Sequence, residues 1–280
     1  MDDRFVILTE HFRSGNGNRR KEINKSIEVN CRIPQTKRVV IFVDPEVEFP
    51  SKYLKSALSK EHYNKIELYD MSAGGRATYS DIFSYANEHL IGENCVLCNN
   101  DISFDETLDL LKNTEDFDLD GHFVSLTRWD VMLDNSLRFK QPVRIRRNSQ
   151  DAWAFRPSLP LKMIDKGGFY MGRPGCDGMV AYLATISGLK VFNPSEVVKA
   201  KHLHLSGHRT YGRRHRMGGD DIYMCVYPTS HIGFEDSKLM YRFGNPKRDV
   251  DSQEAIDRAL EFEKENDTHW DYAIEKCRSR

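Results

Sequence analysis

The first half of the chain alternates short apolar runs with longer stretches whose apolar residues recur at helical spacing. The apolar runs are the length of strands and occupy residues 5–8, 39–43, 66–69 and 95–98. The helical spacing is found at residues 18–31, 51–58 and 78–90. This alternation predicts an α/β domain with a mainly parallel sheet flanked by helices, in which ligands bind beyond the carboxyl ends of the strands.

The second half continues the pattern less regularly. Strand-sized segments lie at residues 122–126 and 191–194, and a helix is predicted from Asp177 to a stop at Gly188. From Ser252 onward, a charged stretch with apolar residues at helical spacing predicts a surface helix. We place a boundary near Ser206, between an α/β body over residues 1–205 and a C-terminal extension over residues 206–280.

Charge and composition narrow the classes of function. The 280 residues include 41 Lys and Arg against 42 Asp and Glu, a formal net charge of -1, and 39% are hydrophobic. This is the composition of a folded protein, and the charge balance excludes binding of polyanions by bulk charge. No nucleic-acid partner is expected. A nucleic-acid-binding protein built on the basic cluster at residues 209–216 is the weakest of the alternative functions, because the cluster has no interleaved aromatic residue beyond Tyr211.

The sequence carries no visible membrane or export signal. Its apolar runs are far shorter than the roughly 20 residues that span a bilayer, and the first residues are acidic where a secretory signal is basic. We therefore expect a cytoplasmic protein without a transmembrane segment. Six scattered cysteines predict reduced thiols. Strand alternation would point Cys95 and Cys98 to opposite faces, which argues against a shared zinc ion.

A polar segment, Asn99-Asn100-Asp101, directly follows the fourth apolar run. A carboxylate at the carboxyl edge of a sheet can hold a divalent cation that bridges two phosphates. Asp101 is therefore the candidate metal ligand. The alternative is a turn in which Asn and Asp are favoured for backbone reasons alone.

Two other strand ends carry candidate groups for an anion or a nucleotide. The loop after the first run contains Thr9 and Arg13 and leads into a helix, and Asp44 closes the second run. Together they imitate a dinucleotide-binding fingerprint, but Arg20 stands where that motif has its third glycine. The alternative is a surface loop with no ligand.

A glycine-rich stretch before residue 78 places Arg76 in front of a capped helix. Thr78 and Asp81 form a capping-box pattern, and Arg76 together with the helix N-terminus could stabilise a phosphate. Tyr79 could stack on a base, but a role in the core is the more common one for such a residue.

Two acids are candidates for a general base. Asp177 follows a Gly/Pro-rich loop at a predicted helix start, where capping alone would also explain it. Asp151 precedes Trp153, which could pack in the core or offer a platform to a sugar ring. Cys176 has no spacing that supports a nucleophilic role.

The late histidines form the last candidate group. His202 and His204 share one face of an extended segment, and His208 follows within a basic cluster. This composition favours an anion or a metal as the ligand, although isolated histidines are more often structural.

Taken in order, these motifs resemble the GT-A type of nucleotide-sugar glycosyltransferase over roughly residues 4–211. The resemblance is carried by the segments at residues 5–9, 76–81, 99–101, 149–153, 175–177 and 202–206. It implies a Rossmann-like sheet, Mn²⁺ or Mg²⁺ as cofactor and a UDP-sugar donor. It also divides the body into a nucleotide-sugar half, residues 1–102, and an acceptor half, residues 103–205. The family's metal motif is Asp-x-Asp, whereas this chain has Asn99 in the first position.

The resemblance also implies roles for individual residues. Asp101 and His204 would contact the metal, with His202 and His208 as alternatives, and Asp177 would be the base of an inverting transfer, with Asp151 second. The nucleotide-sugar pocket would be lined by Thr9, Arg13, Asp44, Arg76, Asp81, Asn99 and Asn100.

The chain length and motif set are similar to those of small glycosyltransferases encoded by large algal viruses (chloroviruses), which include a β-xylosyltransferase. This implies UDP-xylose as donor, a fucose-bearing glycan as acceptor and the host cytoplasm as location. The main alternative is a GT-A-like module that binds glycans or nucleotides without turnover, as the missing first acid suggests. The oligomeric state is not predicted.

Overall fold

The computed structural model describes residues 2–12, 14–71, 75–139, 149–203, 223–235, 237–242, 252–265 and 270. Within these ranges a ten-stranded sheet forms the centre of the molecule. Its strands are β1 (Phe5–His11), β2 (Thr36–Val43), β3 (Ile66–Asp70), β4 (Asn94–Cys98), β5 (Ile102–Ser103), β6 (His122–Val131), β7 (Leu137–Phe139), β8 (Gln150–Phe155), β9 (Lys190–Phe192) and β10 (Ala200–His202). The helices are α1 (Gly17–Arg32), α2 (Ser51–Ala57), α3 (Lys60–Tyr63), α4 (Tyr79–His89), the 3-10 helix η1 (Glu106–Leu111), α6 (Leu161–Asp165), α7 (Cys176–Ile186) and α8 (Ser252–Glu265).

The sheet has a parallel half and a mixed half. Its strand order is β3-β2-β1-β4-β8-β6-β10-β5, and β7 and β9 also pair with β6. The first four strands of this order are parallel, whereas β8 runs antiparallel to both β4 and β6. The predicted α/β class is therefore confirmed, and each of the four early apolar runs lies within a strand.

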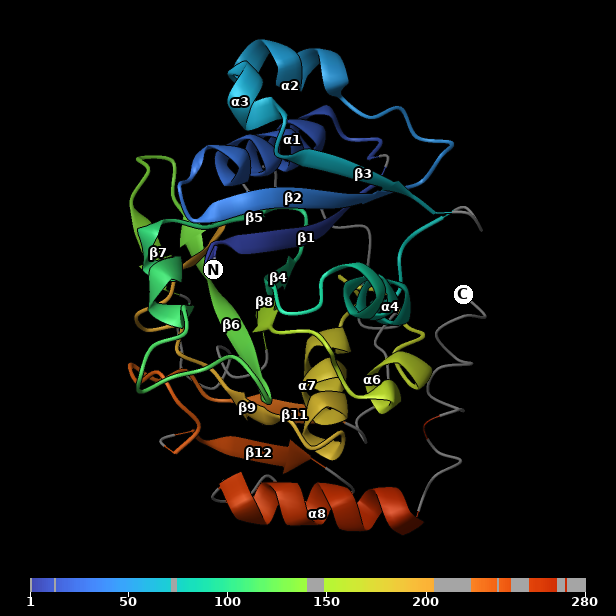
Figure 1. The fold of residues 1–280 in the computed structure, drawn as a ribbon, viewed down its shortest axis with the longest axis vertical. Helices are drawn as coiled ribbons and strands as arrows, with labels where there is room; N and C mark the ends of the chain where they lie inside the picture. The colour runs from blue at the N-terminus through green and yellow to red at the C-terminus, as the bar shows by residue number, and fades with distance from the viewer. Residues whose placement is uncertain are drawn as a thin grey trace.

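Helices cover both faces of the sheet (Figure 1). The α1 residues Ile23, Ile27 and Cys31 pack on one face, together with residues of α2 and η1. The other face is covered by α4, α6 and α7. Cys95 belongs to the cluster on the α4 face and Cys98 to the cluster on the α1 face. The two thiols therefore point in opposite directions, as strand alternation predicted, and cannot share a metal ion.

The start of α4 follows the predicted capping box. Thr78 Oγ1 accepts a hydrogen bond from Asp81 N at 3.2 Å, and Asp81 Oδ2 accepts one from Thr78 N at 2.8 Å. These bonds satisfy free amide hydrogens at the helix start. Gly188, the predicted stop of α7, has a φ of 85°, a conformation that a residue with a Cβ rarely adopts.

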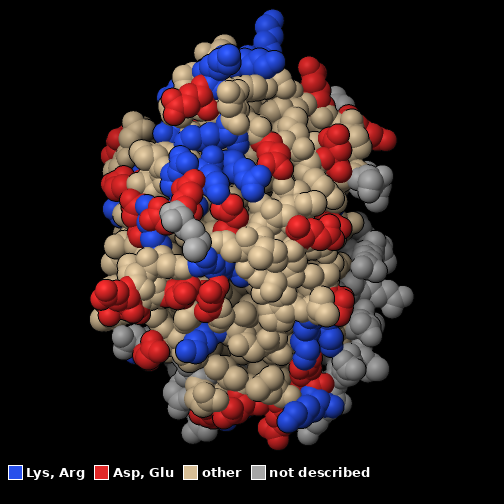
Figure 2. Space-filling view, in the orientation of Figure 1, with Lys and Arg blue, Asp and Glu red and all other residues tan. Residues whose placement is uncertain are grey.

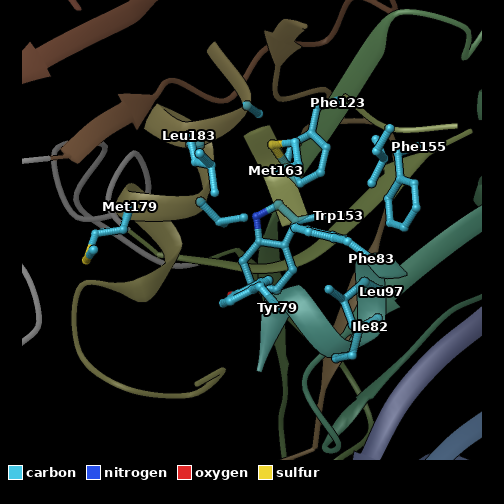
Figure 3. Packing of buried hydrophobic residues seen from close by; sticks show 14 of the residues in the cluster. Tyr79, Ile82, Phe83, Leu97, Phe123, Trp153, Phe155, Met163, Met179 and Leu183 are labelled. Carbon is cyan, nitrogen blue, oxygen red and sulfur yellow. The ribbon is translucent and has the colours of Figure 1, made fainter. Parts of the chain in front are cut away.

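Trp153 lies at the centre of the core on the α4 face. Its side chain is fully buried, and its ring packs edge-on against that of Tyr79, with 5.4 Å between centroids (Figure 3). A sugar platform on Trp153 is therefore wrong, because strand β8 alternation turns this side chain into the core. Tyr79 is equally buried and takes the core role rather than stacking on a base.

The described part of the C-terminal region packs onto the body. Strands β11 (Tyr223–Val226) and β12 (Leu239–Arg242) form an antiparallel pair beside α7, and α8 lies next to β12 (Figure 1). Ala255, Ala259 and Phe262 of α8 join the core cluster of the α4 face. The predicted helix after Ser252 is thus confirmed, while the domain boundary near residue 206 stays a prediction. None of the helices in the described ranges has the length and apolar character needed to traverse a bilayer.

Candidate functional site

Polar side chains gather where the parallel strands end. Thr9 Oγ1 donates to Cys98 O at 3.1 Å, which ties the ends of β1 and β4 together. Leu203 N, just after β10, donates to Asp101 O at 3.0 Å and so connects the segment after β4 to a strand a hundred residues later. Asp101 is thereby held at the carboxyl edge of the sheet, where the sequence predicted it.

Asp101 is buried between two nitrogen donors. Arg19 Nη1, from the first turn of α1, lies 2.6 Å from Asp101 Oδ2, and His202 Nε2 lies 3.0 Å from the same oxygen. The other ring nitrogen, His202 Nδ1, lies 2.9 Å from Asp130 Oδ1 on β6. Arg19 also donates to Asn100 Oδ1 at 3.3 Å. The result is a chain of contacts from α1 through β4 and β10 to β6.

The protonation states of Asp101 and His202 follow from these contacts. Burial raises the pKa of Asp101, but the hydrogen bond from His202 and the charge of Arg19 outweigh burial and hold the pKa well below its usual range. Burial lowers the pKa of His202, yet its bonds to Asp101 and Asp130 prevail and raise it. Asp101 is therefore ionised, and His202 is drawn toward the protonated form in the absence of any ligand.

A β-bulge places a second acid beside this chain. The pairing of β6 with β8 shifts between Leu126 and Thr127, which leaves Asp151 as the extra residue of β8. Asp151 Oδ1 accepts a hydrogen bond from Asn99 Nδ2 at 2.9 Å and lies 3.3 Å from Arg128 Nη1. The side chain of Asn99 is therefore directed at Asp151, so a side-chain hydrogen bond connects the end of β4 to the bulged residue of β8.

The described groups of this site carry a net negative charge. The ion-paired acids are Asp101, Asp130, Asp151 and Glu22, and they face Arg19, Arg128 and His202. Four carboxylates outnumber the positive groups whichever charge His202 carries. An anionic ligand such as a diphosphate would need positive charge beyond that of these described groups.

The surface charge outside the site is mixed. Lys and Arg side chains gather over the part of the molecule where α1 and the starts of the parallel strands lie, with acids beside them (Figure 2). Several basic residues of these elements are ion-paired, such as Lys37 with Glu93 at 2.7 Å and Arg38 with Glu67 at 2.9 Å. These pairs offer no single-sign field that would favour a nucleic acid.

The glycine-rich segment forms a second group of contacts on the α4 side. Arg76 is ion-paired with Glu10 at the end of β1, donates to Met171 O at 2.9 Å and lies over the ring of Phe12. Burial lowers the pKa of Arg76, but the charge of Glu10 more than compensates and raises it. Arg76 is thus held next to the strand ends, with its charge matched by a carboxylate.

The charges of both candidate bases act on the buried Tyr79. Burial raises the pKa of the Tyr79 hydroxyl most, Cys176, which accepts its hydrogen bond, raises it further, and the charges of Asp177 and Asp151 add smaller contributions. Asp177 is half-buried in the first turn of α7, and its Oδ1 accepts from Gly178 N at 3.0 Å. Cys176, beside it, is buried with its pKa raised to about 12, so its thiol is not a nucleophile.

The other predicted residues are placed as follows. Asp44 lies at the end of β2 and accepts from Glu46 N at 3.0 Å, with no described contact to the Asp101 chain. Asp81 is engaged in the α4 cap, and Thr9 in the β1–β4 link. Arg13, His204 and His208 lie outside the described residues.

The sequence predictions missed Arg19, Arg128 and Asp130. Arg19 had a detectable signal, because the first turn of α1 contains no acid and two arginines, an arrangement that the helix dipole disfavours. A residue that breaks a local rule often serves a site. Arg128 and Asp130 had no such signal, since they lie on β6 and their contacts depend on its pairing with β10 and with the bulged strand β8.

Asp101 and His202 have a spacing that fits two ligands of a divalent cation. Asp101 Oδ2 and His202 Nε2 are 3.0 Å apart, and neighbouring ligands in an octahedron with bonds of about 2.1 Å have about that separation. Asp130 behind His202 is the carboxylate partner that metal-binding histidines usually have. No group of three or more His, Cys, Asp or Glu side chains that could enclose an ion occurs in the described ranges. Oxygens of a ligand would have to complete the coordination.

No protein-family model matches this sequence, and no curated protein sequence matches it either. The structure is similar to that of S. aureus TarS residues 1–349 in complex with UDP-GlcNAc, with a TM-score of 0.50 and 12% identity over 75% of this chain and 62% of that one. The fold is of the GT-A type. At this identity the likeness describes the fold alone.

Two further GT-A structures are similar to a lesser degree. The mannosyltransferase PcManGT from Pyrobaculum calidifontis, in complex with GDP-Man and Mn²⁺, has a TM-score of 0.47 and 12% identity over 74% of this chain and 58% of that one. GalNAc-T7 with UDP, GalNAc and Mn²⁺ has a TM-score of 0.48 and 8% identity over 75% and 45%. The chain thus spans less than two thirds of the length of each of these GT-A structures.

Proposed function

We propose that the protein is a metal-dependent glycosyltransferase that moves a sugar from a nucleotide-sugar donor to a hydroxyl of a glycan. The observation that carries the proposal is the chain of contacts from Asp101 through His202 to Asp130 at the carboxyl edge of a GT-A sheet. The described groups of the site are net negative and lie where this fold places nucleotides, which favours a cation as part of the ligand.

Asp101 and His202 would hold Mn²⁺ or Mg²⁺. The motif resemblance assigns this role first to His204, with His202 and His208 as alternatives, and His202 is the one of the three in the described ranges. The ion supplies positive charge to the diphosphate as it leaves the sugar. The chain's own contribution is to hold Asp101 ionised and to orient His202 through Asp130. Both effects are in place before any ligand binds, although an ion at Asp101 would require Arg19 to leave this carboxylate and His202 Nε2 to lose its proton.

The nucleotide would lie along the ends of β1, β2 and β4. Of the residues that the family resemblance assigns to the donor, Asn100 has the clearest support, because its Nδ2 is buried and has no hydrogen-bond partner within the described part of the chain. Arg76, which is ion-paired with Glu10 at the end of β1, would face a phosphate of the donor. Arg13, Asp44 and Asp81 stay as predictions, as do Thr9 and Asn99, whose described bonds are structural.

Asp177 would act as the base that takes the proton of the acceptor hydroxyl in an inverting transfer. It is half-buried and therefore more accessible to an acceptor than Asp151, which is 7% exposed and bonded to Asn99 and Arg128. An ionised carboxylate at the N-terminus of α7 is stabilised by the helix dipole. Asp151 is the second choice.

The finer predictions rest on the motif resemblance. They are xylose from UDP-xylose as the transferred sugar, a fucose-bearing glycan as acceptor and the cytoplasm as location. They also include a catalytic domain over residues 1–205, with nucleotide and acceptor halves at 1–102 and 103–205, followed by an extension over 206–280.

Calorimetry and thermal shift with UDP, GDP and CMP sugars, each with and without Mn²⁺, test the proposal. We expect one nucleotide to stabilise the protein only when Mn²⁺ is present, because a ligand of the folded state raises its apparent stability. Asp101→Asn should abolish this effect while the variant remains folded. Stabilisation of Asp101→Asn equal to that of wild type would refute the assigned metal site.

A binding module without turnover is the second candidate. The contact between Asn99 and Asp151 favours it, because the first position of the metal motif is neither acidic nor directed at a ligand. The two functions differ in turnover. Release of nucleoside diphosphate from a bound donor in the presence of Mn²⁺ would establish the enzyme, and tight donor binding with no release or transfer would establish the module.

A further inference from the structure

Arg19 forms an ion pair with Asp101, the carboxylate to which the proposed function assigns a metal ion. Its Nη1 lies 2.6 Å from Asp101 Oδ2, the oxygen that also faces His202. The guanidinium is mostly shielded from solvent, with 15% of its side chain exposed. A second cation bound at that oxygen would lie within a few ångströms of the guanidinium, and the two would repel one another strongly in a buried setting.

The protein provides Arg19 with alternative acceptors nearby. Glu22, one turn further along α1, lies 3.4 Å from Arg19 Nη1, and Asn100 Oδ1 lies 3.3 Å from its Nη2. A planar guanidinium also matches the oxygens of a diphosphate better than any other side chain does. Arg19 could therefore leave Asp101 toward a diphosphate without losing all of its partners.

We propose that Arg19 is the resident counter-ion of Asp101 and is displaced from it when a divalent ion and a nucleotide diphosphate bind together. The inference rests on the proposed metal site. Arg19 neutralises Asp101 while the site is free of ligand. When ligands bind, the ion coordinates the Asp101 carboxylate, and the guanidinium of Arg19 pairs with the diphosphate instead. The ion alone binds weakly, because it must remove Arg19 and finds only two described protein ligands.

The proposal predicts a gain of metal binding on removal of an arginine. Binding of Mn²⁺ alone should be measured by calorimetry, and by the electron paramagnetic resonance signal of free Mn²⁺, in wild type and in Arg19→Gln. We expect the variant to bind Mn²⁺ at least about tenfold more tightly than wild type. It should also bind UDP more weakly in the absence of metal.

Arg20→Gln is the matched control. Arg20 lies in the same turn of α1 and carries the same charge, but its Nη1 donates to Ser14 O at 2.6 Å. Its replacement should leave Mn²⁺ affinity near that of wild type. The double variant Arg19→Gln with Asp101→Asn should lose the gain, which would assign the new affinity to Asp101. Circular dichroism confirms that each variant is folded.

The outcomes separate the two proposals. If wild type binds Mn²⁺ and UDP together through Asp101, and Arg19→Gln binds Mn²⁺ alone no better than wild type, the counter-ion role is refuted and the metal site stands. If neither wild type nor Arg19→Gln binds Mn²⁺ under any condition, the metal site itself is refuted. An equal gain in Arg20→Gln would show a general charge effect and would also refute the specific role of Arg19.

Discussion

His202 and Asp130 are joined across two neighbouring strands, with Nδ1 of the imidazole 2.9 Å from Oδ1 of the carboxylate. The parallel pairing of β10 with β6 places them directly opposite one another in register. This contact fixes which ring nitrogen of His202 faces Asp101. It is the position that a histidine needs in order to present a lone pair to a cation.

Removal of the carboxylate behind His202 should weaken metal binding without removing a ligand. We expect Asp130→Asn to lower the affinity for Mn²⁺ in the presence of UDP by about 10- to 100-fold, the usual effect of losing such a partner. Calorimetry measures this change. Asp134→Asn in the turn after β6, where Asp134 bonds only to Ser136 among described contacts, is the control and should bind as wild type does. Unchanged affinity in Asp130→Asn would exclude a positioning role.

Restoring the first acid of the family's metal motif should harm this protein. In Asn99→Asp, a carboxylate would replace the amide that donates to Asp151 Oδ1 at 2.9 Å, so two like charges would face each other in a partly buried position. We expect a loss of about 1–3 kcal/mol in the free energy of unfolding at pH 7, measured by urea denaturation. The loss should shrink at lower pH, where one carboxyl is protonated. A variant as stable as wild type at pH 7 would show that Asn99 and Asp151 are not in contact.

The assignment of the base predicts a separation of binding from transfer. Asp177→Asn should reduce sugar transfer by about 10²- to 10⁴-fold, since a base contributes that much, while Mn²⁺-dependent UDP binding stays at the wild-type level. Product formation and calorimetry measure the two quantities. Transfer near the wild-type rate would remove Asp177 from the mechanism and leave Asp151 or a retaining reaction.

Glu28 predicts a pH dependence of stability that is independent of the site. Burial raises its pKa, but hydrogen bonds from Lys25 and from Tyr53 of α2, together with the charge of Arg32, lower it below the ordinary 4.5. A carboxyl whose pKa is depressed by folding contributes stability above its unfolded pKa and loses it as the pH falls through the folded pKa. The difference in unfolding free energy between wild type and Glu28→Gln should be constant near neutrality and shrink below about pH 4.5. A constant difference down to pH 3 would contradict this.

The early elements were predictable because their signals are local. The capping box of Thr78 and Asp81 starts α4 as expected, and the stripe of Ile23, Ile27 and Cys31 covers one face of the sheet. The placement of Asp101 followed from the rule that parallel strands end at one edge. The choice between core and ligand for Trp153 was not predictable, since strand alternation gives two faces but does not say which one another layer covers.

The sequence by itself determined the α/β class, the strand and helix runs of the first half and the position of Asp101 after β4, because hydrophobic periodicity and capping act over a few residues. Only the tertiary structure decided the partners of Asp101. Arg19, His202 and Asp130 are separated from it or from each other by tens of residues, and their contacts depend on strand order, on register and on the direction of α1. Such pairings are set by the packing of whole layers, to which no single stretch of sequence corresponds.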